Sequence, residues 1–136
     1  MTSGNSRRLV VLRPAKSAWP LPADHERPLA PRGRREAPAA GHWLREAGCV
    51  PDLVVCSSAR RACQTWDLVA AEAEFGASMP VIYEVRLYGA SAEELLSVVR
   101  EIPAQVGTLM LIGHNPGVQE LVLTLADEAD GYALEP

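Results

Sequence analysis

Residues 109–117 read LMLIGHNPG: an apolar run, a glycine, a histidine and a turn sequence. A short continuous apolar run bounded by turn signals is typical of a strand that is buried on both faces of a parallel sheet. After the turn, the apolar spacing of residues 117–127 predicts an amphipathic helix. His114 would then lie where a buried strand ends and a helix begins, which is where open α/β sheets place ligand-binding groups.

A similar junction follows the aliphatic run LVVL at residues 9–12, which stops at Arg13-Pro14. Strands and helices are predicted to alternate between the two junctions. This alternation is typical of one α/β domain, a three-layer α/β/α sandwich with a mostly parallel central sheet. The predicted strands are 9–12, 52–56, 81–83 and 108–112. Four helices are predicted: 31–47, one that Ser57 or Ser58 caps and that ends near 74, one that Ser91 caps and that ends at Pro103, and 117–127.

Composition limits the classes of protein that this chain can be. Its 136 residues, 48% of them hydrophobic, are enough for one domain with a true core. A net charge of -4 argues against a general nucleic-acid binder, and no apolar stretch is long enough for a secretory leader or a membrane span. We expect a disordered lead-in over 1–7, the domain over 8–127 and a frayed tail over 128–136.

The three cysteines form no C-x-x-C pair and do not lie at metal-ligand spacing from the histidines. We therefore expect reduced, mostly buried thiols, a cytoplasmic location, and neither a metal ion nor a cofactor. His25 lies in a proline-rich loop that could bring it to a pocket at the sheet edge, but a solvated histidine is the favoured interpretation. His42 is interpreted as a helix-surface residue.

Four polar side chains are expected to meet at the carboxyl edge of the predicted sheet. Arg13 and Ser57 directly follow predicted strands, His114 follows one after Gly113, and Arg61 lies one turn into the helix after Ser57 and Ser58. A helix N-terminus favours anions, and guanidinium groups grip two oxygens at once. The sequence therefore predicts a site for phosphate or a similar oxyanion.

Five segments carry a resemblance to a known family, and they are spread over nearly the whole chain from Arg8. In order they are LRPAKS at 12–17, ERPLAPRG at 26–33, CSSARRACQT at 56–65, LYGAS at 87–91 and GHNPG at 113–117. Together they closely resemble the histidine phosphatase superfamily, and within it the small SixA-type phosphohistidine phosphatases.

The resemblance implies a reaction and a set of residues. In that family a histidine directly after an arginine attacks phosphorus and becomes a transient phosphohistidine, which water then hydrolyses. The residues implied to hold the phosphoryl oxygens here are Arg13, Arg61 and His114, with Ser17 added to the phosphate-binding set. The implied ligands are phosphate, a phosphohistidine-bearing protein or another phosphomonoester. No metal is implied.

Three features depart from the family pattern. Pro14 stands where the family has its nucleophilic histidine, and proline has no nucleophile and no backbone N–H. Relatives often carry an acidic residue directly before the Arg-x-Tyr sequence, whereas here Val85 stands there. Glu84, one place earlier, has two interpretations: a general acid, or an exposed structural carboxylate. The family usually continues into a further strand and helix after the GHNPG helix, so an uncovered sheet edge and a homodimer are hypotheses.

Two functions follow from the sequence. The first is a phosphohistidine phosphatase-like protein whose activity is lost or strongly impaired at Pro14. The second is a non-catalytic module that binds phosphate or a phosphoprotein. A test of phosphate binding and of hydrolysis, in the native chain and in Pro14→His, separates the two.

Overall fold

The computed structural model describes residues 7–13 and 24–128, so Pro14 and Ser17 lie outside the described residues. The described strands form one four-stranded sheet of order β1-β4-β2-β3, in which every neighbouring pair is parallel. The predicted parallel α/β architecture is therefore confirmed. The strands are β1 (Arg8–Leu12), β2 (Leu53–Ser57), β3 (Val81–Glu84) and β4 (Thr108–Ile112).

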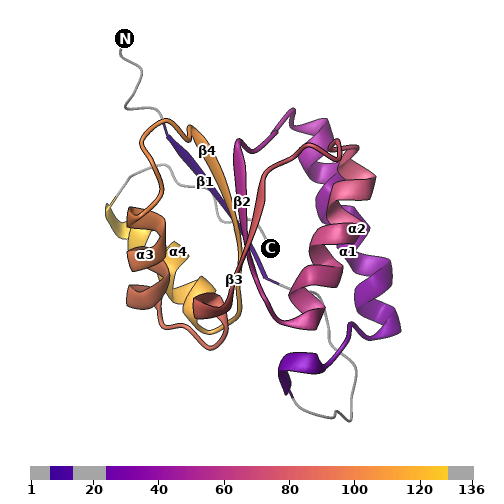
Figure 1. The fold of residues 1–136 in the computed structure, drawn as a ribbon, viewed down its shortest axis with the longest axis horizontal. Helices are drawn as coiled ribbons and strands as arrows, with labels where there is room; N and C mark the ends of the chain where they lie inside the picture. Colours follow the sequence, from indigo (N-terminus) through magenta and orange to yellow (C-terminus); the bar gives the residue numbers. More distant parts are fainter. Residues whose placement is uncertain (1–6, 14–23, 129–136) are drawn as a thin grey trace.

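Two pairs of helices cover the two faces of the sheet, which completes the three layers (Figure 1). One pair buries an apolar cluster against one face, and the other pair buries a second cluster against the opposite face. No described helix is long and apolar enough to cross a membrane. The first pair is α1 (Pro31–Glu46) and α2 (Arg60–Ala73), and the second is α3 (Ala92–Arg100) and α4 (Gly117–Glu128).

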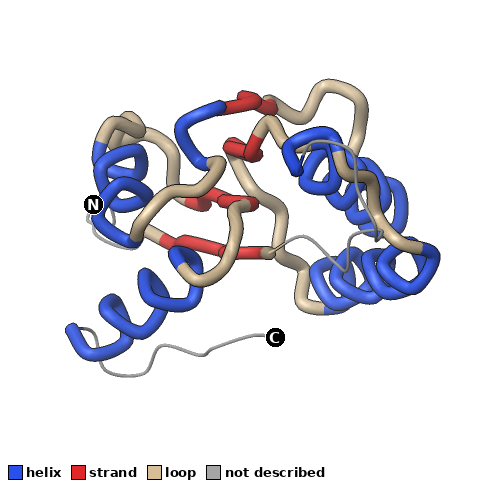
Figure 2. Tube along the Cα trace, turned by 90° about the horizontal axis from the view of Figure 1, so that it is seen from below, coloured by secondary structure: helices blue, strands red, loops and turns tan. Residues whose placement is uncertain are grey.

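Strand β4 occupies the centre of the core. All five of its residues are buried, and it pairs with β1 on one side and β2 on the other. The continuous apolar run at 109–112 is explained by this position, because both faces of β4 are covered by helices. Figure 2 shows the strands between the two helical layers from below.

Helix starts follow local chemistry, with one correction to the sequence prediction. The Ser91 hydroxyl accepts a bond from the Glu94 N–H at 3.1 Å, and the Glu94 carboxylate accepts one from the Ser91 N–H at 2.8 Å, so the predicted capping box is confirmed. The prediction that Ser57 or Ser58 caps α2 is wrong. The N-cap is Ala59, which offers no side-chain oxygen, and both serine hydroxyls are engaged elsewhere.

A glycine allows α4 to begin against the neighbouring loop. A Cβ atom at Gly117 would lie 2.1 Å from the carbonyl oxygen of Ala90, far inside van der Waals contact. Only glycine permits this approach of backbone to backbone. The close contact fixes where α4 starts, and therefore where His114, three residues earlier, stands.

The strand ends bring the predicted edge together. Leu12 and Cys56 both pair with Ile112, and Ser57 pairs with Glu84, so all four strands end at nearly the same level. Two short 3-10 helices border this edge, η2 (Asp24–Glu26) and η3 (Val85–Leu87).

Candidate active site

His114 is held at the end of β4 by a buried serine from the neighbouring strand. Its Nε2 atom is hydrogen-bonded to Oγ of Ser57 at 2.7 Å. Ser57 is fully buried, and its hydroxyl also accepts a bond from the N–H of Ala59 at 3.2 Å. The edge predicted from the sequence thus joins a histidine and a serine across two adjacent strands.

The surroundings of His114 favour its neutral form. Burial and, to a smaller extent, the nearby positive charge of Arg61 together lower the pKa of His114 to about 4, although Asp24 acts in the opposite direction. Burial disfavours the charged imidazole because water no longer solvates it. At neutral pH, His114 is therefore an uncharged imidazole that can donate or accept a hydrogen bond.

The carboxylate of Asp24 accepts hydrogen bonds from two guanidinium groups and one phenol beside this edge. Arg61, in the first turn of α2, donates to the Asp24 carbonyl oxygen at 2.9 Å and to its Oδ2 at 3.4 Å. Arg27 donates to Oδ1 at 2.5 Å, and the hydroxyl of Tyr88 donates to Oδ2. We call these four residues, Asp24, Arg27, Arg61 and Tyr88, the anion cluster.

The electrostatics of the anion cluster keep Asp24 ionised. The Tyr88 hydrogen bond lowers the pKa of the Asp24 carboxyl, and the charges of Arg61 and Arg27 lower it further. The same hydrogen bond raises the pKa of the Tyr88 phenol, because the phenolate would face a carboxylate. The cluster therefore stabilises one oxyanion at the carboxyl edge of the sheet, and in this structure Asp24 supplies it.

Tyr88 also connects the two histidines of the site. Its ring meets the His25 ring edge-on, with centroids 5.0 Å apart, and meets the His114 ring edge-on at 5.6 Å. Edge-to-face packing at these separations is a favourable arrangement of aromatic rings. The imidazoles of His25 and His114 thus lie on the same Tyr88 side chain.

His25 is not the solvated loop residue that the sequence suggested. Its Nε2 atom is hydrogen-bonded to Oγ of Ser58 at 2.9 Å, and its Nδ1 atom to the carboxylate of Glu26 at 2.9 Å. About 35% of its side chain remains exposed. The interpretation failed because the loop composition gives no sign that η2 folds back onto the start of α2.

The described part of the chain contains three of the residues implied to hold phosphate. Arg61 and His114 are brought together, since the charge of Arg61 affects the pKa of His114. Arg13 follows the last residue of β1 at the same edge and is exposed. Pro14 and Ser17 belong to the segment that the structure leaves undescribed.

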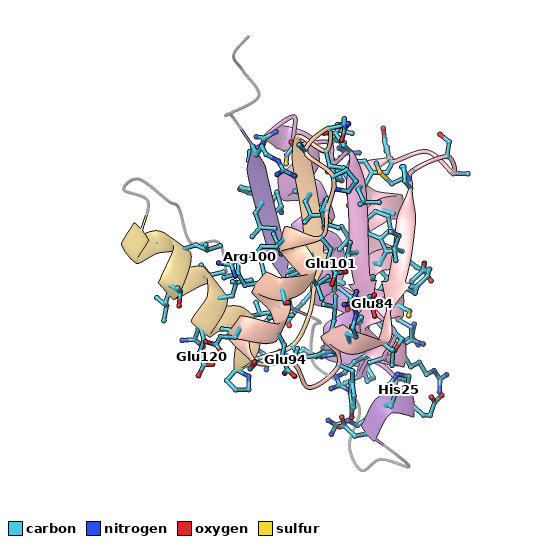
Figure 3. The ribbon with its side chains drawn as sticks, turned by 60° about the vertical axis from the view of Figure 1, so that its left-hand side comes forward. His25, Glu84, Glu94, Arg100, Glu101 and Glu120 are labelled. Carbon is cyan, nitrogen blue, oxygen red and sulfur yellow. The ribbon has the colours of Figure 1, made fainter. Side chains whose placement is uncertain are left out.

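Glu84 is at the same edge, but its side chain is engaged on the α3 side. It accepts bonds from the backbone N–H and the guanidinium of Arg86, each at 3.0 Å, and Arg86 in turn binds Glu101, the C-cap residue of α3. Glu84 and Glu101 are both labelled in Figure 3. These bonds lower the pKa of Glu84, which keeps it deprotonated. The described contacts therefore join Glu84 to Arg86 and not to Arg61 or His114. A general acid must carry a proton, and the lowered pKa of Glu84 disfavours its protonated form.

The cysteines behave as structural thiols in the described residues. All three are free, Cys49 and Cys56 are buried, and Cys63 is half-buried. Burial raises the pKa of the Cys56 thiol and that of Cys63, which disfavours the reactive thiolate. No group of three or more His, Cys, Asp or Glu side chains suited to a metal ion occurs among the residues that the structure describes.

The sequence did not assign a role in the site to Asp24, Arg27, Ser58 or Tyr88. Arg27, Ser58 and Tyr88 lie within segments that carry the family resemblance, and that was the signal that could have found them. Asp24 and Tyr88 are 64 residues apart, and only the fold brings them into contact.

Comparison with known proteins places this geometry in a family. A sequence model of the histidine phosphatase superfamily (branch 1) matches residues 9–105. An uncharacterised protein of Mycobacterium tuberculosis is 44% identical over 116 residues, which cover 85% of this chain and 70% of that protein.

Solved structures agree with this assignment. A protein assigned as the phosphohistidine phosphatase SixA of Agrobacterium tumefaciens superposes with a TM-score of 0.81 at 29% identity, covering 90% of this chain and 78% of its own. The histidine phosphatase SixA in complex with tungstate shares the fold, with a TM-score of 0.77 at 21% identity, covering 94% of this chain and 80% of that one. The chain belongs to the histidine phosphatase superfamily, branch 1, and is SixA-like in structure.

Proposed function

We propose that this protein binds the phosphoryl group of a phosphohistidine-bearing protein, or of a phosphomonoester, at the edge formed by Arg61, Arg27 and His114. The observation that carries the proposal is the anion cluster. Its guanidinium groups and the Tyr88 hydroxyl hold one carboxylate through hydrogen bonds that a phosphoryl oxygen could accept equally well. Tungstate in the related SixA complex is an oxyanion of the same kind.

Hydrolysis through position 14 is the part of the family reaction that this chain lacks. Pro14 supplies no nucleophile, and loss of a covalent nucleophile leaves roughly 10³-fold acceleration over water in a hydrolase triad. Positioning and charge stabilisation by arginines make up most of phosphoryl-transfer catalysis, so these contributions remain. We therefore expect phosphate recognition together with slow turnover.

The test compares the native chain with Pro14→His. Isothermal titration calorimetry with phosphate and with tungstate measures binding, and release of phosphate from a phosphohistidine peptide measures turnover. We expect both chains to bind both anions. We expect Pro14→His to turn over faster by ~10²-fold or more, because covalent catalysis divides a difficult step into two easier ones.

Two results would contradict the proposal. Absence of phosphate and tungstate binding by the native chain rules out recognition of a phosphoryl group. Equal turnover by the two chains rules out Pro14 as the limit on activity. If the native chain binds but shows no turnover above the uncatalysed rate, the non-catalytic binding module is the correct description.

A further inference from the structure

Three side chains beside the anion cluster form a relay that no family role accounts for. The Glu26 carboxylate is hydrogen-bonded to Nδ1 of His25 at 2.9 Å, and Nε2 of the same ring is hydrogen-bonded to Oγ of Ser58 at 2.9 Å. A hydroxyl within hydrogen-bond reach of an imidazole that a carboxylate orients is the geometric signature of an activated nucleophile.

Ser58 stands at a position suited to attack on a charged group. It lies between the end of β2 and the start of α2, and it is partly exposed. The first N–H groups of a helix have no partner within that helix, and the N-cap Ala59 provides no side-chain bond. These donors and the helix dipole would stabilise negative charge that develops on a group bonded to Ser58.

The relay borders the anion cluster directly. His25 packs against the ring of Tyr88, and it follows Asp24, the residue that Arg61 and Arg27 hold. Arg61 itself lies three residues after Ser58, in the first turn of α2. A phosphoryl group bound in place of the Asp24 carboxylate would therefore lie beside the serine and its imidazole partner.

We propose that Ser58 is a second phosphoryl acceptor of this site, with His25 as its general base and Glu26 as the residue that positions His25. The proposal rests on the proposed function, because it requires a phosphoryl group at the anion cluster. The ligand class is a phosphoramidate, meaning a phosphoryl group on nitrogen as in phosphohistidine.

The proposed steps balance as follows. Oγ of Ser58 forms a bond to phosphorus while the P–N bond breaks; the serine proton passes to Nε2 of His25 and then to the departing nitrogen. A water molecule next attacks the phosphoserine, and His25 accepts the proton of that water. Inorganic phosphate leaves, and the proton returns from His25 to Oγ of Ser58.

The experiment uses the full chain with ³²P-labelled phosphoramidate, a small molecule with the required P–N bond. Phosphoserine survives acid, whereas phosphohistidine does not, so acid treatment before counting identifies the kind of label. Fragmentation of the tryptic peptide 46–60 in a mass spectrometer distinguishes Ser58 from Ser57. We expect acid-stable label on Ser58, and none in Ser58→Ala.

Matched variants separate chemistry from architecture. We expect His25→Gln to slow labelling by ~10²-fold or more, the contribution of a general base, while His42→Gln and Ser97→Ala, both on exposed helix surfaces, label at the native rate. Glu26→Gln should slow labelling while leaving the affinity for tungstate unchanged, and Glu26→Asp, which keeps a carboxylate, should recover part of the rate. A merely structural role for Glu26 would lower the tungstate affinity as well.

Tungstate titration of every variant keeps the outcomes distinct. If the native chain binds tungstate but takes up no acid-stable label on Ser58, the acceptor proposal is overturned and the proposed function stands. Label that His25→Gln does not slow overturns the relay. If the native chain does not bind tungstate, the proposed function fails and this proposal fails with it.

Discussion

Replacing Asp24 by asparagine should strengthen the binding of oxyanions. The substitution keeps the shape of the side chain and removes one negative charge from the centre of the anion cluster. In the native chain, a phosphoryl group must displace the Asp24 carboxylate from Arg61 and Arg27 before it can bind them. Asparagine competes much less well, since it lacks the charge that makes both bonds strong.

The size of the effect can be worked from the two ion pairs. Their N···O distances are 3.4 Å to Arg61 and 2.5 Å to Arg27, and 45% of the Asp24 side chain is exposed. Partly exposed pairs of this kind are worth about 0.2–1 kcal/mol each. Repulsion between Asp24 and an incoming dianion adds roughly 2 kcal/mol at about 4 Å in water. The total is about 2.4–4 kcal/mol, so the dissociation constant should fall by roughly fiftyfold to a thousandfold.

Isothermal titration calorimetry with tungstate in one buffer measures this change. Glu36→Gln is the matched control, because it removes a carboxylate from the exposed Arg32–Glu36 pair on α1, which is not part of the anion cluster. We expect the control to bind as the native chain does. Unchanged or weaker binding by Asp24→Asn would refute the reasoning, because Asp24 would then orient the arginines for the ligand instead of competing with it.

Two further predictions concern stability. The pKa of His114 is lowered to about 4, so the unfolded state takes up a proton near pH 6.5 and the folded state does not until about pH 4. The unfolding free energy should therefore fall by ~1–2 kcal/mol as the pH is lowered from 6.5 to 4; the full shift would give roughly 3 kcal/mol, and partial exposure reduces it. His114→Gln should remove this part of the fall, measured by urea denaturation at several pH values. The same pH dependence in His114→Gln and the native chain would contradict the lowered pKa. Gly117→Ala should lower the unfolding free energy by at least ~2 kcal/mol, because its Cβ would lie 2.1 Å from the carbonyl oxygen of Ala90. Gly76→Ala is the control, because the nearest atom to its Cβ would be 3.9 Å away, and its melting temperature should stay nearly unchanged. A small loss of stability for Gly117→Ala would show that α4 can shift without cost.

The architecture was predictable because hydrophobic spacing alone determines it. Continuous apolar runs such as 109–112 and 53–56 have no polar side, which is possible only for strands covered on both faces. Parallel strands then place their following residues at one edge. The proximity of Ser57, Arg61 and His114 follows from that rule, without knowledge of any contact.

The centre of the anion cluster could not be predicted in the same way. Asp24 follows a stretch rich in proline that has no periodicity, and its partners Tyr88 and Arg61 are 64 and 37 residues away. Their contact depends on how η2 and η3 fold over the sheet edge. Neither short helix has a hydrophobic pattern that would show where it packs.

The attachment of η2 has a consequence for the medium in which the protein works. None of the three residues of η2 is buried, and η2 is attached through two side chains: Asp24 binds Arg61 of α2, and His25 binds Ser58, which precedes α2. Contacts between charges near the surface weaken as dissolved ions screen them, over about 8 Å at physiological ionic strength. The structural order of η2 should therefore decrease as the salt concentration rises. The fraction of molecules in which Asp24 and His25 are positioned at the site then depends on the ionic strength of the solution.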